Sequence, residues 1–208
     1  EQDNGALPYV SITVPADFVL FTVQLVTGTA SPDERQRELE RTFASLADRV
    51  KRVQGVTMEV GRPGRSAPLE TAAAREAIVA SRDRSSISTV LKFAIRPGET
   101  FSMVRTRAEA FIDGIPTSGR VEAVTGDNQY IGVNDPKKRR EDLLRKIAED
   151  THLIQSIFSG GKVDGLNGVS LIGLGGRVKS RPVGPLEIEM FIPYNIVLGE
   201  SLPQPPPR

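Results

Sequence analysis

The sequence predicts an α+β fold in which a mixed or mainly antiparallel sheet packs against about three amphipathic helices. Several segments alternate apolar and polar residues, which is typical of half-buried strands. Three longer segments place apolar residues at helical spacing behind recognisable start signals. The clearest alternation runs from Leu186 to Leu198, where every even position is apolar.

Composition favours one domain that folds without covalent staples. The 208 residues are 38% hydrophobic and 25% charged, which is enough for one substantial core. We therefore expect a polar leader over residues 1–7, a single domain over residues 8–200 and a disordered proline-rich tail over residues 201–208. The chain has no cysteine, which excludes disulfides, thiolate zinc sites and cysteine nucleophiles.

Charge and hydropathy exclude two classes of partner. The formal net charge of +1 and the aromatic content of 5% argue against nucleic-acid binding, which usually needs a basic surface and stacking platforms. No apolar run approaches the roughly 20 residues that span a bilayer, so we expect no transmembrane segment.

The first half of the chain predicts strands around one long helix. Tyr9–Val14 and Phe18–Val26 indicate two strands, or one strand bent at Pro15. The stretch Ser31–Glu34 combines an N-cap serine, a proline at the first helical position and a glutamate three residues after the serine, which predicts a helix start. Gly55 is placed to end this helix, whose charged positions we expect to face water. Its apolar face is predicted to hold Leu39, Phe43, Leu46, Val50 and Val53.

A second strand and helix pair is expected to follow. Val56–Val60 reads as a return strand, and Ile87–Ile95 as a further strand before a helix over Glu99–Ile112. Between them the structure of residues 66–82 stays open, because Thr71–Ala80 is helical by propensity and extended by context.

The second half predicts a third helix flanked by strands. Val121–Val133 fits one kinked strand or a hairpin, and Asn134-Asp135-Pro136 is expected to cap a helix that Gly160 and Gly161 end. We then expect a strand over Val163–Leu174, a connection over Gly175–Pro185 and the final strand over Leu186–Leu198. Pro193 suggests an edge or a bulge in that last strand. Glu187 and Glu189 should face solvent or a subunit contact.

No motif predicts a catalytic, cofactor-binding or metal site. His152 is the only histidine, and it lies off the apolar stripe of its helix, so we expect it to be exposed and structural. The Gly160-Gly161-Lys162 stretch lacks the order of elements of a phosphate loop and reads as a helix stop. The glycines of Gly173–Gly176 read as a turn. We therefore expect no cofactor.

The basic run is the one candidate contact site. Lys137, Lys138, Arg139 and Arg140 occupy the predicted first turn of a helix, where cations oppose the macrodipole by roughly 0.3–1 kcal/mol each. Helix formation does not require them there. They suggest a contact with an anionic surface or with an acidic patch of another subunit, although such runs are more often solvated faces.

The order of elements resembles the SIMPL domain family. The resemblance rests on the Val14–Asp17 break, on Thr27–Ala30 leading into a long charged helix, and on the closing stretch Ile188–Tyr194, and it covers roughly residues 8 to 199. It implies a periplasmic or secreted protein, freed of a signal peptide, that forms homo-oligomers, and it carries no catalytic residues. We expect a non-enzymatic envelope protein that self-assembles or binds a partner. The alternative is a small-molecule-binding or enzymatic domain whose site the sequence does not reveal.

Overall fold

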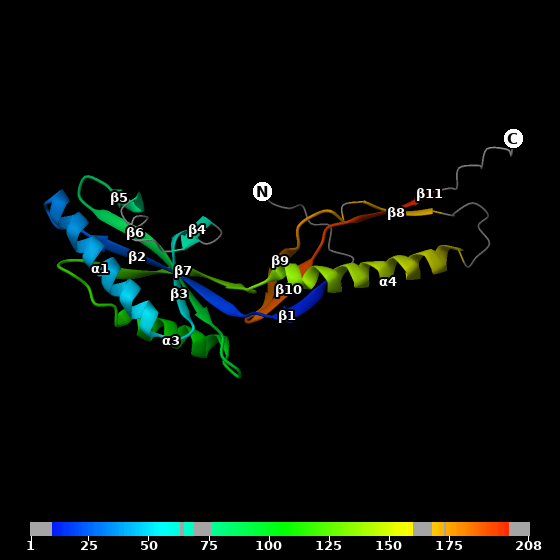
Figure 1. Ribbon diagram of the computed structural model, residues 1–208, viewed down its shortest axis with the longest axis horizontal. Helices are drawn as coiled ribbons and strands as arrows, with labels where there is room; N and C mark the ends of the chain where they lie inside the picture. Colours follow the sequence, from blue (N-terminus) through cyan, green and yellow to red (C-terminus); the bar gives the residue numbers. More distant parts are fainter. Residues whose placement is uncertain (1–9, 63–64, 69–75, 160–167, 173, 200–208) are drawn as a thin grey trace. The chain divides into compact units, whose positions relative to one another are not determined.

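The computed structural model describes residues 10–62, 65–68, 76–159, 168–172 and 174–199, and it confirms the α+β class. The chain divides into two compact units (Figure 1). Unit 1 comprises Glu1–Pro15 and Asp135–Arg208, and unit 2 comprises Ala16–Asn134. The domain expected over residues 8–200 thus contains two units, because the chain leaves unit 1 after one strand and returns only at Asp135. The predicted leader and tail lie outside the described residues.

Unit 2 is an antiparallel sheet with two helices along one of its faces (Figure 1). The strand order is β4-β3-β6-β2-β7, and β5 also pairs with β6. The elements are β2 (Phe18–Thr27), α1 (Pro32–Arg52), β3 (Val56–Arg62), β4 (Arg65–Pro68), β5 (Ile78–Ala80), β6 (Ser85–Ala94), α3 (Phe101–Asp113) and β7 (Glu122–Gly132).

The core of unit 2 lies between the sheet and these helices. Alternate residues of β2 are almost completely buried and face partners in β6, with Phe21 opposite Leu91 and Val19 opposite Phe93. The Phe93 ring packs edge-to-face against Phe21 at 5.5 Å and against Phe111 of α3 at 5.7 Å. The apolar faces of the helices complete the core with Leu39, Phe43, Leu46, Val104, Ala108, Phe111 and Ile112.

Helix α1 begins as predicted. The Ser31 hydroxyl accepts a hydrogen bond from the Glu34 N–H, and Pro32 occupies the first turn. The charged positions expected to face water lie between the apolar residues from Leu39 to Val53. Arg35, one turn before them, is buried, with 3% of its area exposed. Its side chain lies on the inner face because backbone carbonyls there accept its hydrogen bonds.

One open alternative is settled in unit 2. Residues 122–132 form one strand, β7, whose pairing with β2 shifts register between Phe21 and Val23, so the kinked strand is correct and the hairpin is not. In the ambiguous stretch, Glu76 is helical and Ile78–Ala80 forms the strand β5, so its described end contains both of the expected states. Residues 69–75 lie outside the described residues.

Unit 1 combines one long helix with two small antiparallel sheets. Its first sheet has the order β1-β10-β9, and its second pairs β11 with β8. The buried side chains on the first sheet and on the start of the helix include Val14, Leu143, Ile147, Ile188 and Met190. The elements are β1 (Ile12–Pro15), the 3-10 helix η1 (Pro136–Arg139), α4 (Arg140–Ser159), β8 (Gly168–Ile172), β9 (Lys179–Gly184), β10 (Glu187–Phe191) and β11 (Asn195–Gly199).

The final strand is two strands. Alternation continues from Ile188 to Tyr194 with the even positions buried, as predicted, but β10 and β11 belong to different sheets. The single strand expected over Leu186–Leu198 is wrong because the chain leaves the sheet at residues 192–194, where Pro193 cannot donate to a ladder. The connection expected before it contains a strand, β9, which makes β10 the central strand of its sheet and not an edge.

Candidate functional site

The basic run does not occupy the first turn of an α-helix. Lys137, Lys138 and Arg139 form the 3-10 turn η1, and only Arg140 belongs to α4. The predicted cap fails because the Asp135 side chain makes no capping hydrogen bond. The three cations of η1 therefore do not oppose the first turn of the long helix in the way the sequence suggested.

Arg140 is committed to the fold of unit 1. Its guanidinium donates hydrogen bonds to the carbonyls of Gly176, at 2.6 Å, and of Leu174, at 2.5 Å. These acceptors lie in the turn predicted from the glycines at residues 173–176, of which 174–176 are described. A side chain that fixes a turn is not available to a partner, so the candidate contact site shrinks to Lys137, Lys138 and Arg139.

The remaining cations of the basic run lie at the surface. Lys138 is 3.7 Å from Asp135 and Arg139 is 3.8 Å from Asp142. These are long, exposed ion pairs of the kind that contributes between nothing and about 1 kcal/mol. Both side chains can turn towards an anion outside the chain at little cost.

The C-terminal half of α4 is apolar and exposed. Leu153 is 57% exposed and Ile157 is 63% exposed, while Ile154 beside them is half-buried. We call these three residues the α4 end surface. The first half of the helix instead buries Leu143 and Ile147 completely. Helix α4 therefore buries apolar residues near its start, whereas Leu153 and Ile157 towards its end stay exposed.

The second sheet of unit 1 has only two strands. Ile196 of β11 pairs with Leu171 of β8, and Leu198 pairs with Val169. Among the described residues no third strand joins this ladder. Two-stranded ladders are marginally stable in water and leave a row of backbone donors and acceptors on each outer edge.

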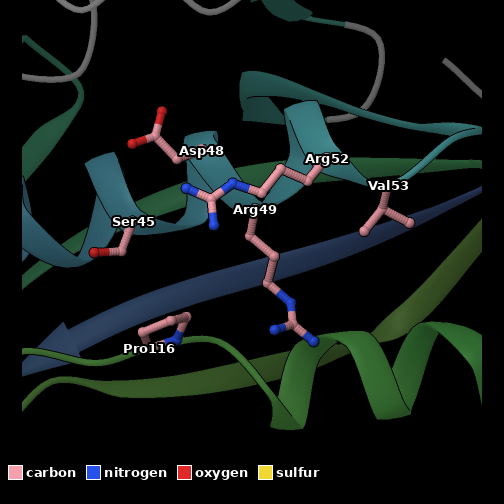
Figure 2. A pocket seen from close by; sticks show the side chains of 6 residues that line it. All are labelled: Ser45, Asp48, Arg49, Arg52, Val53 and Pro116. Carbon is pink, nitrogen blue, oxygen red and sulfur yellow. The ribbon is translucent and has the colours of Figure 1, made fainter.

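A cleft in unit 2 lies beside the C-terminal half of α1 (Figure 2). Its volume is about 450 Å³. Figure 2 shows Arg49 pointing from α1 towards α3, whereas Arg52 lies along α1 beside Ser45 and Asp48. Pro116, in the segment after α3, forms the opposite wall, and the complete lining is Ser45, Asp48, Arg49, Arg52, Val53 and Pro116. We call this space the α1–α3 cleft.

A second depression in unit 1 lies next to α4. Its volume is about 480 Å³, and Lys146, Glu149 and Asp150 supply its charges. Tyr194 donates a hydrogen bond of 3.1 Å to Asp150, so one of these carboxylates already has a partner. His152, one helical turn from Glu149, is exposed as predicted. In the part of the chain that the structure describes, no three histidine, cysteine or acidic residues gather as metal ligands would.

Of the two acidic residues of β10, Glu189 is not in solvent. Glu189 accepts a hydrogen bond of 2.7 Å from the Ser11 hydroxyl and forms an ion pair with Arg181 of β9. These two donors lower the pKa of Glu189 and outweigh its partial burial. The sequence prediction that Glu189 faces solvent or a subunit is therefore wrong, because neighbouring strands of its own sheet supply its partners. Glu187 is exposed.

A polar cluster fixes the N-terminal half of α1 in unit 2. Glu38 accepts hydrogen bonds of 2.8 Å from the hydroxyls of both Thr29 and Thr27. The hydrogen bond from Thr29, followed by that from Thr27, holds the pKa of Glu38 below its ordinary value. Gly119 lies against the same carboxylate with a φ of +61°. This cluster connects the N-terminal half of α1 to the segment after β2.

Sequence reasoning missed both the α4 end surface and the α1–α3 cleft. The α4 end surface could not be predicted because helical periodicity shows which side chains share a face and not whether anything covers that face. The second had a signal, since Ser45, Asp48, Arg49 and Arg52 follow the spacing of one helix face. What the sequence could not show is that the segment after α3 stands opposite them.

Comparisons with known proteins leave the family of this chain open. No family model matches the sequence, and no curated protein matches it. Within the described residues, no helix combines the length and the apolar character needed to cross a bilayer. Function therefore has to be argued from the surfaces described above.

Proposed function

We propose that this chain is a non-enzymatic envelope protein, periplasmic or secreted, that acts through self-assembly, and that unit 1 carries the contact. The α4 end surface is the observation that supports this most directly. Leu153 and Ile157 expose more than half of their area on a helix that buries Leu143 and Ile147 completely in its first half. Apolar residues gathered on an exposed helix face are typical of interaction sites.

The apolar area of the α4 end surface determines how much further contact self-assembly needs. Full burial of a leucine or isoleucine side chain contributes about 1.5–3 kcal/mol. Leu153 and Ile157 have a little more than half of their area left to bury, so together they contribute roughly 2–4 kcal/mol per subunit, or about 4–7 kcal/mol in a two-fold pair. Association costs about 4–15 kcal/mol in lost freedom of motion. The apolar side chains of two copies therefore offset only the lower part of this cost, and a stable pair needs further contacts.

The ladder of β8 and β11 can supply the missing contribution. Each unpaired edge offers backbone donors and acceptors, and each hydrogen bond made across an interface contributes about 0.5–1.5 kcal/mol. A second copy of the same chain is the occupant we propose, because it brings an identical edge and an identical apolar helix end. Self-complementary patches of this kind give closed two-fold contacts.

The envelope location rests on the resemblance to SIMPL domains. Part of the order of elements on which that resemblance was based is present: a strand, a long charged helix, a return strand and, after the short strands β4 and β5, a further strand and helix. The single closing strand is not, because it is divided between β10 and β11. Fractionation of the native host, with the chain followed by antibody, tests this part: we expect the protein in the periplasmic or culture-medium fraction and not with cytoplasmic markers.

The self-assembly experiment uses the full chain and measures its mass by sedimentation velocity over a range of concentrations. The wild type is expected to associate, and the double variant Leu153→Asp with Ile157→Asp to dissociate. Met103→Asp is the matched control, because Met103 is also an exposed apolar helical residue, at 54%, but belongs to unit 2. A wild type that stays monomeric at every concentration, or a control that dissociates equally, contradicts the proposal.

The basic run has its own test as an anionic contact. Lys137, Lys138 and Arg139 are changed to glutamine while Arg140 is kept, since its two carbonyl contacts belong to the fold. If the run contacts an anionic surface, binding to vesicles with anionic lipid weakens in the triple variant and in high salt. Unchanged vesicle binding together with unchanged self-association removes this contact.

A second candidate function, binding of a small molecule, is supported by the α1–α3 cleft. The volume of the cleft lies in the range of about 300–1,000 Å³ that is usual for ligand sites. Two arginines line it, and they are the feature that gives the cleft a chemical preference.

A further inference from the structure

The arginines of the α1–α3 cleft have no acceptor among the described residues. Neither Arg49 nor Arg52 makes a hydrogen bond or an ion pair with another described residue. The Nε atom of Arg49 is buried and has no hydrogen-bond partner in the part of the chain that the structure describes. Buried donors are nearly always paired, and one that is not calls for an explanation.

The Arg49 guanidinium is nevertheless held in place. It lies over the Phe111 ring, with its central carbon 4.9 Å from the ring centroid. Gly114 makes room for it, because a Cβ at that position would stand 2.5 Å from one guanidinium nitrogen and 3.1 Å from the central carbon. A cation fixed by an aromatic face and a glycine is preorganised, so an arriving anion does not have to order it.

The charges around the cleft select the kind of anion. Asp48 lies 3.3 Å from the Lys51 ammonium, which leaves Arg49 and Arg52 as the cations that face the cleft. The cleft also lies at the C-terminal ends of α1 and α3, where the helix dipoles carry partial negative charge. The two helix ends lower the positive potential of the two guanidiniums, so the cleft suits a singly charged group better than a dianion.

We propose that the α1–α3 cleft binds a small organic carboxylate. The carboxylate contacts the guanidinium of Arg52, whose planar donor pair matches its two oxygens, and the fixed cation of Arg49 adds positive charge to the same cleft. The carbon skeleton of the ligand packs against Val53 and Pro116, which form the apolar part of the lining. This inference rests on the second candidate function, small-molecule binding, and is independent of self-assembly.

The experiment follows backbone amide signals of the full chain by NMR during titration with hexanoate. We expect saturable shifts confined to residues 45–53 and 114–116. Acetate, which lacks the apolar tail, should bind more weakly, and inorganic phosphate tests the preference for a single charge. Arg52→Gln should weaken hexanoate binding about tenfold or more, since one charge-assisted contact is lost. Arg37→Gln is the matched control, because Arg37 is an exposed arginine of the same helix outside the lining.

The outcomes separate the ligand class from the function. Saturable hexanoate shifts that weaken in Arg52→Gln and persist in Arg37→Gln support the proposal. Phosphate binding in the cleft without hexanoate binding overturns the carboxylate preference and leaves small-molecule binding standing. Shifts that never saturate with any probe, or that are equal in both variants, overturn the inference and the second candidate function together. Arg52→Gln removes no described contact, so it is expected to fold.

Discussion

Replacing Arg35 by methionine is expected to destabilise unit 2 strongly. The guanidinium is 3% exposed and donates to the carbonyl of Thr29 at 2.9 Å, to that of Ala30 at 3.4 Å, and to the Ser85 hydroxyl at 3.2 Å. It also reaches two carbonyls in the turn between β5 and β6, at 3.3 and 3.5 Å. One side chain thus joins the start of α1 to two loops.

The magnitude follows from the lengths of these hydrogen bonds. A good hydrogen bond to a charged group contributes about 1.5–3 kcal/mol, and each of the longer ones is taken as roughly 0.5 kcal/mol. Methionine fills much of the space and avoids the desolvation of a cation, but it leaves the carbonyls without a donor. We expect a loss of about 3–4 kcal/mol, out of a total stability of about 5–15 kcal/mol for an ordinary domain.

Urea unfolding followed by circular dichroism measures this loss. Arg37→Met on the exposed face of the same helix is the control and should change the stability by no more than about 0.5 kcal/mol. A loss below about 1 kcal/mol for Arg35→Met would refute the reasoning, because it would mean that water replaces the guanidinium at all five acceptors.

Three further outcomes are expected. Hydrogen bonds from Thr29 and Thr27 lower the pKa of Glu38 in the folded state. The contribution of Glu38 to stability is therefore present above its ordinary pKa of 4.5 and is lost as the pH falls through the lower folded value. Urea midpoints between pH 6 and pH 3 should fall less in Thr29→Val than in the wild type. Gly119→Ala should destabilise more than Gly98→Ala, since both glycines have positive φ but only Gly119 lies against Glu38, and thermal melts would contradict this if the two were equal. Phe93→Ala removes a completely buried ring and should cost about 3–5 kcal/mol in urea unfolding, and a cost under 1 kcal/mol would contradict the packing described.

Local signals predicted the elements well where they are set by neighbouring residues. The Ser31 cap, the alternation on β2 and the helical face of α3 depend on side chains within a few positions, and each is present. The division of residues 186–198 between two sheets depends on partners far along the chain, in β1 and in β8, which no local pattern reports.

The candidate sites were harder to predict than the fold. The basic run was visible as a charge pattern, but the carbonyls that accept hydrogen bonds from Arg140 lie more than 30 positions further along the chain. The α1–α3 cleft needs two helix ends and the segment after α3 to meet. Burial of Arg35 was hidden for the same reason, because its acceptors are backbone groups whose positions depend on the folded loops.

The pairing of β1 with β10 has a consequence for how the chain is made. Ile12 lies opposite Met190, so the first strand emerges from the ribosome long before its partner exists. At synthesis rates of about 5–20 residues per second, β1 waits roughly 10–35 s, while the continuous segment Ala16–Asn134 can already fold. During that time β1 is an unpaired strand, open to capture by a chaperone or by another nascent chain.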